Sequence, residues 1–206
     1  MRHSELLLAL TSLFALASSS REHPRSKVEL EPQEPWQVTK LTTGSPSGRP
    51  GSSPYAHLFG NITNPSSIPA GPGVSFDPSS ANCTVEWVWA EEEPYGRTVE
   101  CDTAEVELSG PGSGSGSISK WTIEVLQANT SHPSPTEDMN VKFTLTTNLT
   151  VDGNEYYKVL EGTQHFSLWE NMRGTCGGSG VCSWNLREEN IPVLIQPTVV
   201  ACQGTC

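Results

Sequence analysis

The stretch of sequence that decides the fold reads VKFTLTTNLTV and covers residues 141–151. One set of alternating positions is apolar: Val141, Phe143, Leu145, Leu149 and Val151. The opposite set is polar: Lys142, Thr144, Thr146, Asn148 and Thr150. Because successive side chains of a strand point to opposite faces, this pattern predicts a β-strand with one buried side.

A hairpin is predicted directly after this strand. Asp152-Gly153 is the pair that a type I′ turn favours, since both central positions of that turn need a positive φ. We expect a return strand over residues 155–160, a second turn at Glu161-Gly162 and a further strand over residues 165–169.

The same alternation extends outward in both directions. Strands are expected at residues 36–42, 55–63, 84–89, 98–108 (one bent strand or two short ones), 117–127, 181–186 and 193–200. Pro192, just before the last of these, and Pro197, within it, favour an edge position, and a flexible Gly/Ser loop is expected at residues 109–116. Eight to eleven strands without a convincing helix predict an all-β fold, an antiparallel β-sandwich or β-barrel.

The N-terminus is typical of a secretory signal. A basic residue, Arg2, precedes an apolar run over residues 6–17 that ends in Ala15-Leu16-Ala17, the small-x-small pattern of signal peptidase sites. The run is too short to cross a bilayer, which needs about 20 apolar residues, so no membrane span is expected. We therefore predict a signal peptide (1–17), a disordered acidic and Pro-rich leader (18–35) and a single β-rich domain (36–206) in a secreted, extracellular protein.

Six cysteines follow the predicted signal, and an even number in an exported chain indicates disulfides. No Cys-x2-Cys pair is present to suggest zinc. Of the 15 possible pairings, we expect the one that joins each cysteine to its neighbour in the sequence: Cys83–Cys101, Cys176–Cys182 and Cys202–Cys206. Four sequons predict N-glycosylation, at Asn61, Asn82, Asn129 and Asn148.

Charge excludes some partners. The formal net charge is −11, from 12 Lys and Arg against 23 Asp and Glu. Such a chain repels phosphate backbones and anionic membranes, so nucleic acid is not an expected partner. The expected partner is an unidentified extracellular protein or a glycan.

Catalytic signatures are weak. His57, His132 and His165 lack metal-ligand spacing, and no Gly-x-Ser-x-Gly elbow occurs, so no metal, cofactor or catalytic residue is predicted. The glutamates at 91–93 and 188–189 leave open a glycosidase or a weak calcium site, although neighbouring glutamates in a loop are usually just solvated.

The six tryptophans are more informative. Most are expected to pack inside the sandwich, while one or two would form an exposed platform for sugar rings or a partner. Trp169 and Trp184, which flank a Gly-rich loop, are the candidates for that surface. Arg49, in a loop with several prolines, could face an anionic partner or simply sit in a shaped turn.

Three motifs together carry a family resemblance: PSGRPGSSPY (46–55), CTVEW (83–87) and NMRGTCGGSGVC (171–182). They resemble small secreted cysteine-containing proteins of filamentous ascomycete fungi, in particular the group similar to the major Alternaria allergen. The resemblance covers residues 36–200 and implies a compact disulfide-stapled β-barrel or sandwich that acts outside the cell in host interaction or immune recognition. The third cysteine pair, the Gly/Ser loop and the acidic leader depart from that group.

The sequence therefore favours binding over catalysis: a secreted, effector-like or cell-surface-associated module. A carbohydrate-binding or carbohydrate-active extracellular protein is the main alternative, and a structural wall protein is the third.

Overall fold

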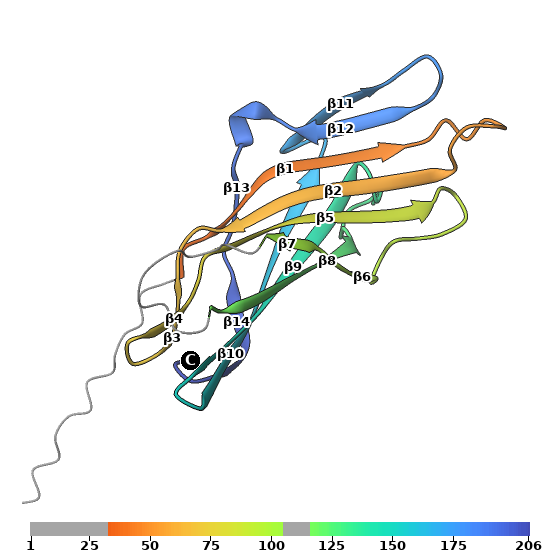
Figure 1. Cartoon of the computed structure of the whole chain (residues 1–206). Coiled ribbons are helices and arrows are strands. Elements are labelled where there is room, and N and C mark those ends of the chain that lie inside the picture. Colours follow the sequence, from red (N-terminus) through yellow and green to blue (C-terminus); the bar gives the residue numbers. More distant parts are fainter. Residues whose placement is uncertain (1–32, 105–115) are drawn as a thin grey trace, which may run out of the picture. The chain divides into compact units, whose positions relative to one another are not determined.

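The computed structural model describes residues 33–104 and 116–206 (Figure 1). The described residues belong to one compact unit. The predicted signal peptide, leader residues 18–32 and residues 109–115 of the predicted Gly/Ser loop lie outside the described part. Within it, no helix is long and apolar enough to cross a membrane.

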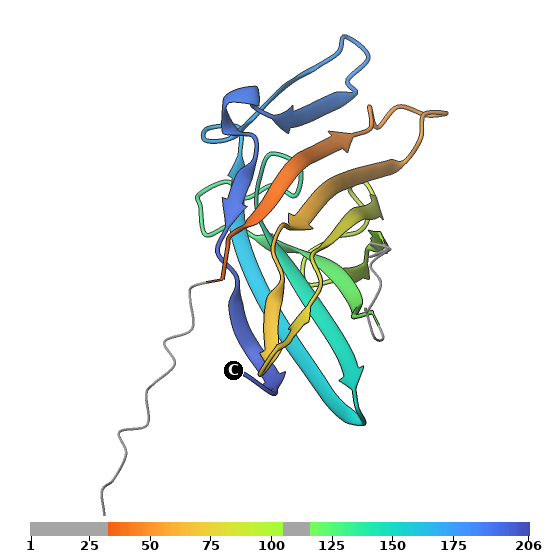
Figure 2. The ribbon, with the colours of Figure 1, turned by 60° about the vertical axis from the view of Figure 1, so that its left-hand side comes forward.

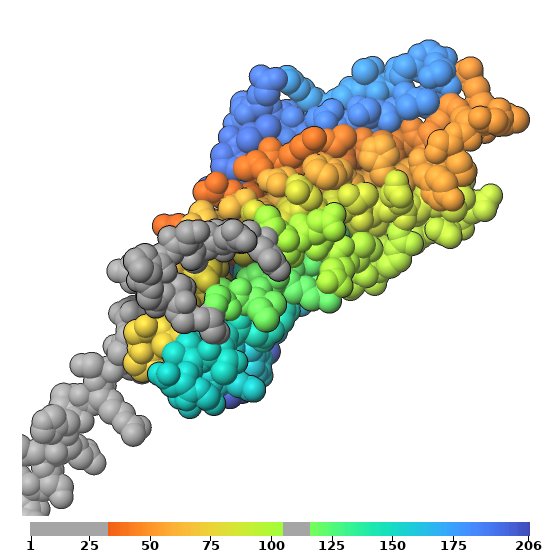
Figure 3. Space-filling model, viewed as in Figure 1, coloured from red at the N-terminus to blue at the C-terminus, as the bar shows by residue number. Residues whose placement is uncertain are grey.

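One layer is a sheet that we call the first sheet. It follows the order β11 (Met172–Cys176), β12 (Cys182–Leu186), β1 (Trp36–Ser45), β2 (Tyr55–Asn64), β5 (Ser79–Val88) and β7 (Asp102–Ala104), with β13 (Val193–Ile195) also paired to β1. In Figure 3 its strands form adjacent bands, from the blue β11–β12 hairpin through orange β1 and β2 to yellow-green β5.

The second sheet follows the order β14 (Thr198–Gln203), β10 (Asn154–Ser167), β9 (Asp138–Val151), β8 (Ile118–Gln127) and β6 (Thr98–Glu100). A separate hairpin joins β3 (Ile68–Gly71) to β4 (Val74–Phe76), and a single helical turn, η1, covers Glu188–Asn190. Neighbouring strands are antiparallel in all three sheets, and the described strands do not close into a barrel. The fold is thus an all-β, sandwich-like one, as the alternation predicted.

The core lies between the two sheets (Figure 2). Trp36 of β1 and Trp121 of β8 meet across it, with ring centroids 4.7 Å apart in an edge-to-face arrangement. In β9, Val141, Phe143 and Leu145 are buried while the residues between them are partly exposed, which confirms the assignment of that strand's two faces.

The predicted hairpin after β9 is confirmed. Asp152 and Gly153 have φ values of 50° and 78°, as a type I′ turn requires. The predicted second turn at Glu161-Gly162 is wrong, because β10 pairs with β9 without interruption from Asn154 to Ser167. Gly162 serves close packing instead: a Cβ there would lie 2.6 Å from Cγ2 of Ile195 and 3.2 Å from the ring of Trp36.

The expected C-terminal strand is two strands. β13 pairs with β1 in the first sheet and β14 pairs with β10 in the second, with Pro197 between them. The region expected at residues 98–108 holds two short strands, β6 and β7, in its described part. The described part of the chain has 14 strands, more than the eight to eleven expected. The sequence gives little sign of the shortest ones: β3 contains proline and glycine, and β4 has only three residues.

All three expected disulfides are present: Cys83–Cys101, Cys176–Cys182 and Cys202–Cys206. Both cysteines of the first pair are buried and join β5 to the residue between β6 and β7. The second pair closes the β11–β12 hairpin, and the third links β14 to residue 206. Two of the three bonds therefore stabilise local turns, and the first holds the margin of the sandwich.

Candidate functional site

The tryptophans divide into packed and accessible side chains. Four are buried: Trp36, Trp87, Trp121 and Trp184. Trp169 is 83% exposed in the turn between β10 and β11. Trp89 is half-buried at the end of β5.

The prediction that Trp184 contributes to an exposed surface is wrong. Its side chain is only 3% exposed. Because side chains of β12 alternate, Trp184 and Leu186 turn inward while Ser183 and Asn185 face outward. Trp169 therefore stands without the second ring that the sequence suggested for it.

Three loops gather at one end of the first sheet, where Figure 1 shows the β1–β2 loop, the β11–β12 tip and the loop after β5. Arg49 is exposed and its Nη2 donates to the carbonyl oxygen of Gly178 at 3.4 Å, so it links two of these loops. The amide of Trp89 donates to the carbonyl oxygen of Pro54 at 2.8 Å and links the third. Arg49 remains a predicted contact residue, with part of its donor capacity used within the protein.

The loop after β5 turns sharply as the strand ends. The amides of Glu91 and Glu92 both donate to the carbonyl oxygen of Val88, at 3.3 and 3.0 Å, and Ala90 adopts a positive φ of 62°. The carboxylate of Glu92 accepts the amide of Val88 at 3.2 Å. These bonds hold residues 91–93 beside the Trp89 ring and do not leave them as a free acidic run.

The chain then crosses from the first sheet to the second. Tyr95 forms an isolated parallel bridge with Val125 of β8, and the amide of Gly96 donates to the carbonyl oxygen of Val125 at 2.9 Å. The crossing leaves a concave surface of about 430 Å³ at this end of the sandwich. We call it the Trp89 groove; it is bounded mainly by Trp87, Trp89, residues 91–93, Tyr95, Gln127, Pro133 and Pro135.

The groove combines rings with hydrogen-bonding groups. Trp89 and the two prolines are half-buried and supply apolar surface, whereas the three glutamates and Gln127 are exposed. No ion pair in the described part of the chain involves Glu91, Glu92 or Glu93. Their charges are thus available to a ligand.

Tyr95 also lines the groove. Its hydroxyl is buried and, among the described residues, has no hydrogen-bond partner. Burial, with the negative charges of Glu93 and Asp138, raises the pKa of Tyr95 to about 12, so the phenol stays protonated at physiological pH.

A charged cluster anchors the loop behind the groove. His165 of β10 lies between two carboxylates, with Nε2 2.7 Å from Oδ1 of Asp138 and Nδ1 3.0 Å from Oε2 of Glu170. Thr130 donates to the other oxygen of Asp138 at 2.7 Å. The residues from 130 to 138, which include both groove prolines, are thus tied to the second sheet.

Opposing effects set the pKa of His165. Burial by itself lowers the pKa, but the hydrogen bonds and charges of Asp138 and Glu170 together outweigh it and hold the pKa above its ordinary value. No local spacing in the sequence indicates this cluster. His165 and Asp138 are near one another only through the long β9–β10 pairing, which places Asp138 opposite Ser167.

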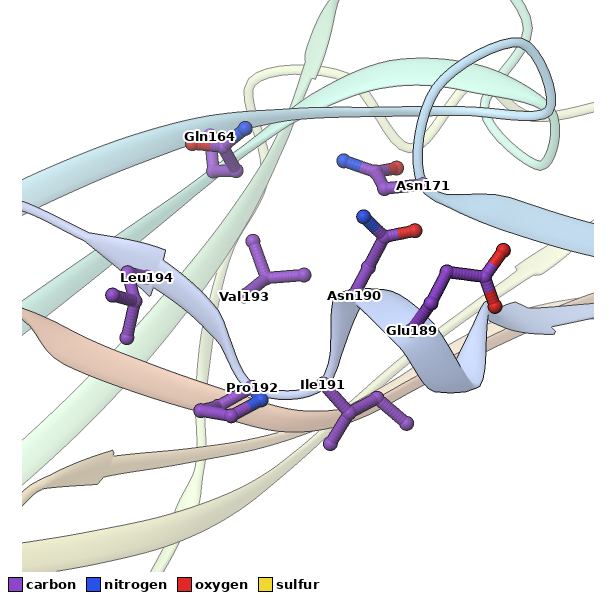
Figure 4. Close-up of a pocket in the computed structure, with 8 residues that line it drawn as sticks. All are labelled: Gln164, Asn171, Glu189, Asn190, Ile191, Pro192, Val193 and Leu194. Atoms are coloured by element: carbon purple, nitrogen blue, oxygen red, sulfur yellow. The ribbon is translucent and has the colours of Figure 1, made fainter.

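A second concave surface, of about 390 Å³, lies beside η1 (Figure 4). Figure 4 shows the amides of Gln164, Asn171 and Asn190 above the η1–β13 connection, with Ile191 pointing away below it. Asn171 donates to the carbonyl oxygen of His165 and accepts the amide of Ser167, at 2.9 and 3.1 Å. The side-chain amide of Asn171 therefore mainly stabilises the turn. The buried Oδ1 of Asn190 is an acceptor that has no hydrogen-bond partner in the described part of the chain.

The four sequon asparagines occupy different environments. Asn82, Asn129 and Asn148 are exposed. Asn61 is half-buried, stands opposite Asn82 in the β2–β5 pairing, and donates from Nδ2 to its Oδ1 at 3.0 Å. Glycosylation at these positions remains a prediction.

The groove brings together an acidic run and aromatic side chains that the sequence suggested as two separate sites. The glutamates at 91–93 were considered as a carboxylate site and the tryptophans as a possible platform, but Trp89, Tyr95 and Gln127 were not assigned to a site. The run from Trp87 to Tyr95, with two tryptophans, three glutamates and a tyrosine, is the signal that would have indicated them. Pro133 and Pro135 join the groove only through the tertiary fold.

Among the described residues, no group of three or more His, Cys, Asp or Glu side chains is placed to hold a metal ion. Comparison with known proteins found no matching family model, no similar curated protein and no similar solved structure.

Proposed function

We propose that this chain is a secreted, non-enzymatic binding protein and that the Trp89 groove binds a carbohydrate. The observation that carries the proposal is the juxtaposition of Trp89, Tyr95 and the solvent-exposed glutamates at 91–93 in one concavity of about 430 Å³. Aromatic rings pack against the apolar faces of sugar rings, and carboxylates and amides accept hydrogen bonds from sugar hydroxyls.

Secretion is supported by the N-terminal signal pattern and by three disulfides, which form and persist in oxidising compartments. The resemblance of three motifs to small secreted fungal proteins supports an effector-like or cell-surface-associated role. The four sequons support a glycoprotein.

The arrangement of the carboxylates favours binding over turnover. A glycosidase needs a pair of facing carboxyl groups, one of them kept protonated as the general acid. The three glutamates of the groove are consecutive in one turn, and no other segment of its lining supplies a carboxyl group to face them.

The test is a titration of the purified, disulfide-bonded protein with soluble plant and fungal oligosaccharides, followed by calorimetry. Trp89→Ala should weaken binding of the best ligand by about 10- to 100-fold, because the ring's apolar burial on binding is lost. Trp169→Ala is the matched control, since it removes an exposed tryptophan outside the groove, and should leave the affinity unchanged.

Each outcome separates a different part of the proposal. Loss of affinity in Trp169→Ala but not in Trp89→Ala would move the site away from the groove. Shortened oligosaccharides after prolonged incubation, detected by chromatography, would overturn the non-enzymatic assignment. Absence of affinity for every sugar would overturn the carbohydrate assignment.

A further inference from the structure

The C-terminal strand leaves one edge of the second sheet open. β14 is the last strand in the sheet order, and within residues 33–104 and 116–206 it pairs with β10 alone. In Figure 2 it is the dark blue strand at the margin of that sheet. Its second side therefore presents backbone N–H and C=O groups that another strand can pair with.

The side chains along this edge are apolar and accessible. Val199 and Val200 of β14 are 43% and 53% exposed. Val199 lies opposite Leu160, whose side chain is in the core, so the apolar inner face of the sheet continues to the open edge.

The edge is also free of charge. From Asn190 to Cys206 the sequence holds no Asp, Glu, Lys, Arg or His, although the chain as a whole has a formal net charge of −11. Exposed edge strands usually carry charged residues, above all lysine, or proline, which prevent pairing with other chains. β14 carries neither within Thr198–Gln203, and its one protective feature is a bulge between the pairs Ala201–Val159 and Val199–Leu160.

The charge pattern indicates what would pair with this edge. Two copies of an acidic chain repel one another over most of their surfaces, and a neutral segment is where they can approach. A basic partner, by contrast, would be attracted to acidic surface and would gain nothing from a neutral edge.

We propose that β14 is a homodimer interface, in which two copies of the chain pair their β14 strands antiparallel about a two-fold axis. The two second sheets then form one continuous sheet, and the valines of one copy contact those of the other. Since the same edge is used by both copies, the pairing is closed and stops at the dimer.

The experiment measures the mass of the purified, disulfide-bonded protein by analytical ultracentrifugation across a wide concentration range. We expect a reversible monomer–dimer equilibrium. Val200→Lys should weaken it by at least about 100-fold, because it places a like charge from each copy at the interface. Val181→Lys is the matched control: Val181 is 49% exposed in the β11–β12 turn and should leave dimerisation unchanged.

Salt gives a second readout. Raising the salt concentration should tighten the dimer, because it screens the repulsion between two acidic chains while a neutral interface has no ion pair to lose. A protein that stays monomeric at every concentration, a dimer that Val200→Lys does not weaken, or growth into larger open assemblies would each overturn the proposal. Circular dichroism confirms that both variants are folded.

Discussion

Packing at Gly162 gives the sharpest test of how the two sheets meet. An alanine Cβ at this position would lie 2.6 Å from Cγ2 of Ile195 and 3.2 Å from Cε3 and Cζ3 of Trp36. Both neighbours are buried, at 1% and 0% exposure, so neither side chain can move into solvent. Overpacking of this kind costs about 1–3 kcal/mol. For a domain of this size, the melting temperature of Gly162→Ala should fall by about 2–12 °C.

The measurement is calorimetric unfolding under non-reducing conditions, with Gly60→Ala as the control. A Cβ at Gly60 would make ordinary contacts at 3.7 Å or more, with Phe143 and Ile123 across the core. That variant loses the same backbone freedom in the unfolded state and should be unchanged or stabilised by about 0.4–1 kcal/mol.

A double variant identifies the cause. Ile195→Ala removes the atom that Gly162→Ala would meet first, so the added cost of Gly162→Ala should be smaller in that background. Equal stability of Gly162→Ala and Gly60→Ala would refute the view that this glycine exists to let Trp36 and Ile195 approach β10. So would a cost of Gly162→Ala that is the same with and without Ile195.

Three further predictions concern titration and covalent links. Because the pKa of His165 is raised, its contribution to stability is complete below the unfolded value of about 6.5 and is lost as pH rises through the folded pKa. The urea midpoint should therefore decline less between pH 5 and 9 in His165→Gln than in the parent protein. Parallel pH profiles of the two proteins would contradict this role of His165. Burial lowers the pKa of Lys158, whose amine donates to the carbonyl oxygen of Pro69 at 2.7 Å. The unfolded state therefore binds more protons between the folded pKa and 10.5, stability should rise with pH through that window, and Lys158→Met should abolish the rise. Replacing both Cys83 and Cys101 by alanine should cost about 3 kcal/mol, since the bond closes a separation of 18 residues; chemical denaturation with the other two disulfides intact measures it, and a loss below about 1 kcal/mol would mean that the link restrains the unfolded chain little.

The sequence could predict which face of a long strand is buried, where a hairpin turn follows it and which cysteines pair. These features depend on the spacing of residues that are near one another in the chain. The alternation in residues 141–151 assigned the buried face of β9, and Asp152-Gly153 placed the hairpin, since both signals involve neighbours in the chain. Glycine misled the same reasoning at Gly162, where its role is to accommodate a residue more than thirty positions away.

Only the tertiary structure decided what surrounds the candidate site. Trp89 and Glu92 are close in sequence, but Gln127, Pro133 and Pro135 reach the groove because the chain crosses from one sheet to the other there. Likewise, His165 meets Asp138 through the pairing of two fourteen-residue strands. The physical reason is that period and turn chemistry specify each strand's own faces, whereas the order and stacking of strands depend on packing free energy summed over the whole core.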